Sequence, residues 1–172
     1  EWLPALIAGE RRIALAHVES RARPGLLWVE ARAQANGAGS QLSGGKAYVP
    51  AGNGADGFIV SARTHGEPDQ ADGLGLYFVP ANAPGLSIEA WRMADGEAAV
   101  SLHFDNMVGA IPLQGGREAI EQAQTLANLA RCAEALGIME RIFAETLDYL
   151  RTREQFGSKL AGFQAIQHRM AM

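Results

Sequence analysis

A change in the spacing of apolar residues at Gly115-Gly116 constrains the fold of this chain more than any other feature. Before this point, short apolar runs alternate with turn-forming residues, which is the pattern of β-strands. After it, the segment 117–152 contains no proline, and its apolar residues recur at steps of three and four, on one stripe of a helix. The stripe consists of Leu126, Leu129, Ala133, Leu136, Met139, Phe143, Leu147 and Leu150. The sequence therefore predicts a strand-rich part followed by a helical part.

The strand-rich part is expected to form a compact β-structure over residues 11–115. Its apolar runs are interpreted as strands and lie at 13–16, 26–29, 46–49, 58–61, 74–79, 86–91 and 100–104. Turn signals such as Pro24-Gly25, Asn53-Gly54 and Pro84-Gly85 recur about every ten residues. This spacing favours an antiparallel β-barrel or sandwich. Because 48% of the residues are hydrophobic, the chain can form a core.

The helical part is expected to be an incomplete bundle, which makes the fold class α+β. A helix over 117–152 is long for a globular protein, and bundles bury the stripes of such helices. Phe156-Gly157 interrupts the helical pattern, and a second helix is expected to start near Ala161.

The chain is predicted to have three parts. Residues 1–10 would end a preceding helical segment, 11–115 would form a middle β-barrel domain, and 116–172 would begin a C-terminal four-helix-bundle domain. The chain starts at Glu1 without an initiator methionine and stops at Met172 inside a helical pattern. We therefore expect it to be an excerpt from a longer polypeptide.

Composition excludes several classes of function. The net charge is −4 and the basic residues are scattered, whereas a nucleic-acid surface needs a clustered basic face. The sequence has no apolar run of about eighteen residues, so we expect no membrane span. Cys132 is the sole cysteine and cannot form an internal disulfide, which favours a reducing, cytoplasmic setting.

The most specific motif lies at residues 149–168. It reads Tyr-Leu-Arg-Thr-Arg-Glu-Gln-Phe-Gly-Ser-Lys-Leu-Ala-Gly-Phe-Gln-Ala-Ile-Gln-His. A long helix ending in Arg-x-Gln-Phe-Gly, followed by a helix that opens with Phe-Gln-x-x-Gln, closely resembles the signature of the acyl-CoA dehydrogenases. The segments 45–49 and 55–63 look like paired strands of that family's middle domain. Residues 104–106, Phe-Asp-Asn, resemble the end of that domain just before the crossover to the helices.

The resemblance implies a function and its partners. Acyl-CoA dehydrogenases remove an α-proton and a β-hydride from an acyl-CoA thioester, as in fatty acid β-oxidation, and form the trans-2-enoyl-CoA. The resemblance therefore implies FAD as cofactor, acyl-CoA as substrate, and an electron-transfer flavoprotein or a similar acceptor as partner. It also implies a homo- or hetero-oligomer of dehydrogenase subunits.

The Arg-x-Gln-Phe-Gly turn is the first candidate site. Arg153 lies at a helix C-terminus, where a cation is favoured, and a guanidinium can donate two hydrogen bonds to phosphate oxygens. Gln155 adds a neutral donor, Phe156 an apolar face, and Gly157 can adopt the positive φ of a turn. In the family this turn reaches a neighbouring subunit's FAD pyrophosphate, so the resemblance makes Arg153, Gln155 and Phe156 cofactor-binding candidates. A helix end with an exposed arginine is the simpler alternative.

The flavin-facing positions of the middle domain depart from the family pattern. The family's Thr-Glu-Pro-x-Ala-Gly-Ser-Asp loop is reduced to its acidic residue, Glu19. Val18 stands where a Thr would bond the isoalloxazine edge, and Pro24 where a Ser would bond phosphate. Tyr48 stands where a Trp often covers the flavin, and Pro50 where a Thr bonds near flavin N5. Proline has neither a hydroxyl nor an N–H, but Val18, Tyr48 and Pro50 remain the expected cofactor-binding positions.

The resemblance assigns no catalytic residue to this chain. Most family members carry the carboxylate base downstream of the segments matched here. A minority carry it on the first long helix, at the position aligned with Ala127, and alanine cannot act as a base. Glu134 lies two turns further, roughly 10 Å away, which is too far to substitute. The family arginine that helps to seat acyl-CoA aligns with Asn128, which is the substrate-binding candidate.

A non-catalytic structural subunit is one alternative. Val18, Pro24, Pro50 and Ala127 suggest a degenerate flavin site in a subunit that keeps only the fold and the Arg153 turn. The sequence is similar in this respect to the divergent second subunits of heteromeric acyl-CoA dehydrogenases, such as the small subunit of pimeloyl-CoA dehydrogenase.

A metal-binding β-barrel is the other alternative. Three histidines precede an acidic residue by two positions, as in His17 and Glu19, His65 and Glu67, and His103 and Asp105. Residues i and i+2 share one face of a strand, so each pair could supply two ligands. The pairs lack a clustered His-x-His spacing, so we expect no metal site.

Overall fold

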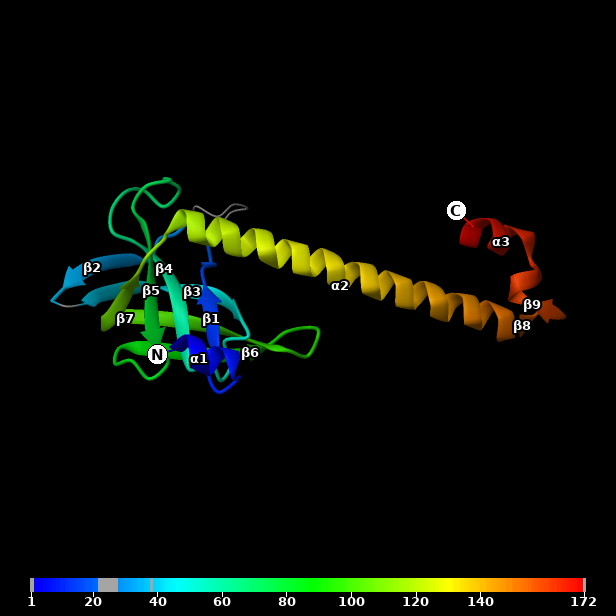
Figure 1. The fold of residues 1–172 in the computed structure, drawn as a ribbon, viewed down its shortest axis with the longest axis horizontal. Helices are drawn as coiled ribbons and strands as arrows, with labels where there is room; N and C mark the ends of the chain where they lie inside the picture. Colours follow the sequence, from blue (N-terminus) through cyan, green and yellow to red (C-terminus); the bar gives the residue numbers. More distant parts are fainter. Residues whose placement is uncertain (1, 22–27, 38, 172) are drawn as a thin grey trace. The chain divides into compact units, whose positions relative to one another are not determined.

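The computed structural model describes residues 2–21, 28–37 and 39–171. The chain divides into two compact units, Glu1–Glu121 and Gln122–Met172 (Figure 1). The elements of the first unit are α1 (Trp2–Ile7), β1 (Ile13–Ala16), β2 (Arg32–Asn36), β3 (Gly39–Pro50), β4 (Gly57–Arg63), β5 (Leu74–Pro80), β6 (Leu86–Arg92), β7 (Ala98–Leu113) and the start of α2 (Arg117–Thr152). The remainder of α2, β8 (Glu154–Gln155), β9 (Ser158–Lys159), a 3₁₀ turn at Leu160–Gly162 and α3 (Gln164–Ala171) belong to the second unit.

The strands of the first unit close into a ring. Each strand in the order β4–β2–β3–β7–β5 pairs with the next, and β5 pairs again with β4. The pairing between β2 and β4 is the shortest in the ring. Arg32 lies opposite Arg63 there, and the Arg63 N–H donates to the Ala31 carbonyl at 2.8 Å. Strand β6 pairs with β7 outside the ring, and β1 pairs with β4. Closure removes most free strand edges, as in other small barrels.

The core lies inside this ring. Phe58, Phe104, Leu42, Val60 and Val79 are among its almost fully buried side chains. Burial of one such side chain contributes about 1.5–3 kcal/mol, so the core is the main source of stability for the first unit.

The expected fold class is confirmed, with strands followed by helices. Two pairings, β1 with β4 and β2 with β4, are parallel, so the sheet is mixed. The expected helix over 117–152 coincides with α2. The second helix, α3, starts at Gln164, after the 3₁₀ turn, rather than near Ala161. The boundaries at 10 and 115 stay predictions.

The expected strand at 26–29 is wrong for its described residues, Trp28 and Val29, which lie in no strand. The Val29 N–H donates to the Pro68 carbonyl at 2.9 Å, and its carbonyl accepts from Arg63 Nε at 3.0 Å. A loop and a side chain thus satisfy this backbone instead of a neighbouring strand. The strand of this region is β2, which begins at Arg32.

Candidate functional site

An aromatic and aliphatic face on the outside of the barrel brings two of the expected flavin positions together. Val18 forms an isolated antiparallel bridge with Tyr48, and the Ala47 N–H donates to the Val18 carbonyl at 2.9 Å. The ring of Tyr48 lies 5.9 Å from the ring of Trp91 on β6. Val18, Tyr48 and Trp91 are 41%, 39% and 39% exposed. We call these residues the Val18–Tyr48–Trp91 face.

A β-bulge in β3 explains why Tyr48 points outward. Lys46 lies opposite Leu102 and Val49 opposite Val100, so β3 has one residue more than β7 in this interval. Lys46 and Val49 are consequently both buried, although they are three residues apart. Strict alternation would have placed one of them outside.

The third expected flavin position, Pro50, ends the same strand. It lies opposite Ala99 of β7, which in turn lies opposite Trp91 of β6. The side chain of Pro50 is exposed. Proline supplies no donor there, so this position offers a flavin only apolar contact. The substitution at Pro24 lies outside the described residues.

A buried ion pair lies directly behind this face. Lys46 Nζ is 2.6 Å from Glu19 Oε1, and their side chains are 0% and 4% exposed. The ammonium also donates to Ser61 Oγ at 3.0 Å and to the His17 carbonyl at 3.3 Å. Glu19 accepts from the backbone N–H groups of Glu30 at 2.6 Å and Ala31 at 3.1 Å.

The electrostatic state of this pair is set by burial. Burial lowers the pKa of Lys46 to about 8, because the charged form loses its hydration, and Glu19 opposes this effect. A hollow of about 380 Å³ adjoins the pair, and its lining includes Ser20, Glu30 and His103. The sequence indicated Glu19, but not Lys46, as a residue of this site. The available signal was a lysine inside an apolar strand run. If such a lysine faces inward, its charge requires a buried partner of opposite charge.

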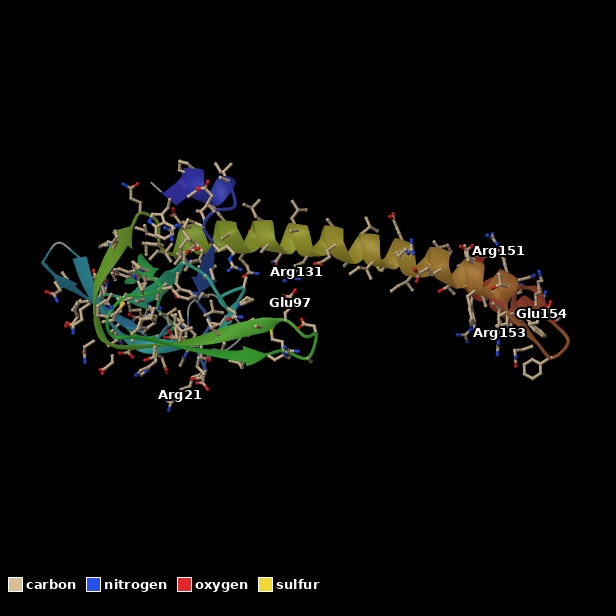
Figure 2. The ribbon with its side chains drawn as sticks, turned by 90° about the horizontal axis from the view of Figure 1, so that it is seen from below. Arg21, Glu97, Arg131, Arg151, Arg153 and Glu154 are labelled. Atoms are coloured by element: carbon tan, nitrogen blue, oxygen red, sulfur yellow. The ribbon has the colours of Figure 1, made fainter. Side chains whose placement is uncertain are left out.

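The Arg-x-Gln-Phe-Gly turn forms a hairpin at the end of α2. The Arg153 N–H donates to the Tyr149 carbonyl at 2.8 Å and completes the last helical turn. Glu154 then pairs with Lys159, and Gln155 with Ser158. Figure 2 shows Arg153 at this end of the helix, with Glu154 in the adjoining hairpin.

The tip of this hairpin is a tight two-residue turn. Phe156 and Gly157 have φ values of 55° and 78°, which are typical of a type I′ turn. A positive φ is unfavourable for phenylalanine and is characteristic of functional segments. Phe156 is 92% exposed, and its ring meets that of Phe163 edge-on at 6.3 Å. Arg153, Gln155 and Phe156 are all exposed, as a surface that binds a ligand requires.

The expected substrate residue, Asn128, lies on the exposed surface of α2. Its Oδ1 accepts from Gln124 Nε2 at 2.9 Å, one helical turn earlier. Ala127 beside it is also exposed.

Two residues of the histidine and acid pairs have other partners in the structure. Glu19 is bound to Lys46, and His17 Nδ1 lies 2.9 Å from Ser61 Oγ. Within residues 2–21, 28–37 and 39–171, no group of three or more His, Cys, Asp or Glu residues is arranged to hold a metal ion. Across the same described residues, no helix is both long and apolar enough to span a bilayer.

The chain is similar in sequence to known proteins. Residues 114–172 match the family described as acyl-CoA dehydrogenase, C-terminal domain. Acyl-CoA dehydrogenase FadE27 of Mycobacterium tuberculosis is 33% identical over 141 residues, which make up 81% of this chain and 36% of that protein.

Solved structures show the same relationship. A variant of the Tcur3481-Tcur3483 steroid ACAD is 36% identical with a TM-score of 0.80, over 98% of this chain and 44% of that one. An FAD-dependent dehydrogenase is 28% identical with a TM-score of 0.84, over 98% and 47% of the two chains. The chain spans less than half the length of each of these proteins. On these similarities of sequence and fold, the chain belongs to the acyl-CoA dehydrogenase family.

Proposed function

We propose that this chain is part of an FAD-dependent acyl-CoA dehydrogenase that converts an acyl-CoA thioester into the trans-2-enoyl-CoA. The observation that carries the proposal is the exposed Val18–Tyr48–Trp91 face, on a barrel that shares the fold of an FAD-dependent dehydrogenase. An exposed apolar and aromatic surface is suited to a planar ring system.

The residues present fit a flavin at this face, although with fewer hydrogen bonds than the family pattern provides. Val18 and Tyr48 would contact the ring, and Pro50 at the end of β3 would pack against its edge. Two hydroxyls of the family pattern are replaced at Val18 and Pro50. Each lost neutral hydrogen bond weakens binding by about 1 kcal/mol. When bound, FAD would supply the acceptor for the hydride that leaves the β-carbon.

The hairpin at 154–159 would complete a second flavin site, on a neighbouring subunit. Arg153 would bind the pyrophosphate of that FAD through charge-assisted hydrogen bonds, with Gln155 as a neutral donor and Phe156 as an apolar contact. The functional unit would thus be an oligomer of dehydrogenase subunits.

The chain's own contribution to substrate binding would be the amide of Asn128. It would hydrogen-bond the acyl-CoA without the charge that the family arginine supplies. The carboxylate that removes the α-proton would come from outside this chain, because Ala127 has no acidic group. An electron-transfer flavoprotein or a similar acceptor would reoxidise the cofactor. The free, exposed Cys132 suits a cytoplasmic setting.

A structural subunit of a heteromeric dehydrogenase is the second candidate. Pro50 favours it, because this exposed residue at the end of β3 provides neither a hydroxyl nor an N–H for a flavin. In that case the complex would hold FAD in only part of its subunits. Counting flavins per subunit in the purified complex separates the two candidates.

A pair of neighbouring arginines tests the proposed role of the hairpin. In the complete polypeptide, with any partner subunit, Arg153→Ala should lower the retained FAD at least about tenfold, since a charged hydrogen bond to phosphate is lost. Arg151→Ala is the matched control. Arg151 is exposed at the same helix end, and its Nη1 lies 3.6 Å from Asp148 Oδ1. Equal FAD retention in the two variants would contradict the proposed role of Arg153.

A further inference from the structure

Lys46 uses all three of its N–H donors, and Glu19 accepts three hydrogen bonds. Lys46 directs its three N–H groups to Glu19, Ser61 and the His17 carbonyl, and both oxygens of Glu19 accept from the backbone at 30–31. The pair therefore ties together three strands or segments of the barrel: 17–19, β3 and β4. It also fixes the segment that leads into β2.

Both ends of the exposed Val18–Tyr48 bridge are attached to this pair. Val18 lies between His17 and Glu19. The ammonium of Lys46 donates to the carbonyl of His17 and to the carboxylate of Glu19. Tyr48 lies two residues after Lys46, within the bulge, and the N–H of Ala47 between them donates to the Val18 carbonyl. A change in the pair must therefore move the backbone of both residues.

A buried ion pair is poorly explained by stability alone. The loss of hydration on burial offsets most of the attraction between the charges, and apolar pairs of similar volume are often equally stable. Control of local geometry therefore explains the charged pair better than stability does.

We propose that Lys46 and Glu19 are positioning residues that hold the Val18–Tyr48 edge in the conformation that accepts the flavin ring. The inference rests on the proposed function, since it assumes that this face binds FAD. Neither residue contacts the flavin in this account. Both act through the backbone of Val18 and Tyr48.

The test uses the complete polypeptide, with any partner subunit, and separates geometry from stability. The variants are Lys46→Met, the double variant Lys46→Met with Glu19→Gln, and the control Glu67→Gln, which changes an exposed carboxylate in the loop after β4. Each form is measured for its melting temperature without flavin, its Kd for FAD by fluorescence quenching, and the visible circular dichroism of bound FAD.

The single variant leaves the Glu19 charge buried without its cation, so its melting temperature should fall. The double variant removes that charge and should recover most of the melting temperature. It should still bind FAD about tenfold more weakly, with an altered circular dichroism spectrum, because the edge is no longer fixed. The control should match the wild type in all measurements.

The outcomes distinguish this inference from the function on which it rests. A wild-type protein that does not bind FAD overturns both. A wild-type protein that binds FAD, with a double variant of unchanged Kd and spectrum, overturns the positioning role alone. If the double variant does not fold, Glu19→Gln alone decides, because its amide nitrogen replaces one carboxylate oxygen and cannot accept from Lys46 or from the backbone N–H groups at 30–31. Unchanged FAD binding in that variant would again overturn the role.

Discussion

At the scale of single residues, Lys46 should make the stability of the barrel depend on pH. Its pKa is about 8 in the folded state, below the ordinary 10.5, because burial disfavours the ammonium. Between these values the unfolded chain binds more protons than the folded chain, so the free energy of unfolding should rise with pH from about 8 to 10.5. The full gain is about 3 kcal/mol.

Urea unfolding at a series of pH values checks this prediction. The reference is the double variant Lys46→Met with Glu19→Gln, in which neither residue of the pair titrates. The difference in unfolding free energy between wild type and reference should rise across the window. A difference that stays flat, or falls, would contradict the assigned pKa of Lys46.

Arg63 is a second buried cation, and it fixes the loop between β4 and β5. Its guanidinium donates to the carbonyls of Val29 at 3.0 Å, Pro68 at 2.8 Å, Gln70 at 2.6 Å and Asp72 at 2.7 Å. Arg63→Met removes all of these hydrogen bonds, although the Pro68 carbonyl still accepts from the Val29 N–H. We expect the free energy of unfolding to fall by about 3 kcal/mol or more. Urea unfolding measures the change. The control is Arg92→Met, at an exposed position of β6, and an equal effect of both substitutions would refute the role of Arg63.

Single buried polar residues were the least predictable feature of the sequence. Lys46 and Ser61 lie inside apolar runs, where alternation alone gives no reason to place them inward. The bulge that lets both Lys46 and Val49 face inward depends on pairing with β7, about fifty residues later in the chain. Glu19 was singled out because the family resemblance marked its position, whereas its partner Lys46 was not.

At the scale of helices and strands, the local spacing and type of residues decided which elements could be predicted. Helix α2 coincides with its predicted range because its spacing is continuous and contains no proline. Strand β2, Arg-Ala-Gln-Ala-Asn, was missed because it lacks the β-branched and aromatic residues that favour strands. The sequence predicted a turn at Gly157, whose φ is positive, but it gave no signal for the positive φ of Phe156 that makes this turn a hairpin.

The hairpin conformation gives a prediction for Gly157. A Cβ at this position would meet no atom within 4 Å, so Gly157→Ala acts only through its φ of +78°. The strain of about 1 kcal/mol should speed amide exchange roughly fivefold at Leu160, whose N–H donates to the Arg153 carbonyl. Gly162→Ala is the control, since its Cβ is equally free and its φ is not positive. Equal exchange rates in both variants would contradict the type I′ assignment.

At the scale of the whole molecule, the apolar stripe of α2 needs a covering. Most of its predicted residues are exposed, including Leu126, Leu129, Leu136 and Met139, and only Leu147 and Leu150 are partly buried. The sequence identified these residues as a buried face because their spacing is regular, but it could not show what covers them. We expect other helices of the complete protein to complete the bundle.

The proposed function is tested most directly by an absorbance spectrum of the complete protein, purified with any partner subunit, before and after addition of a series of acyl-CoA thioesters without oxygen. We predict a flavin band that bleaches with acyl-CoAs of one chain-length class. A stable protein that carries no flavin band and takes up no added FAD would contradict it, and only the family fold would remain.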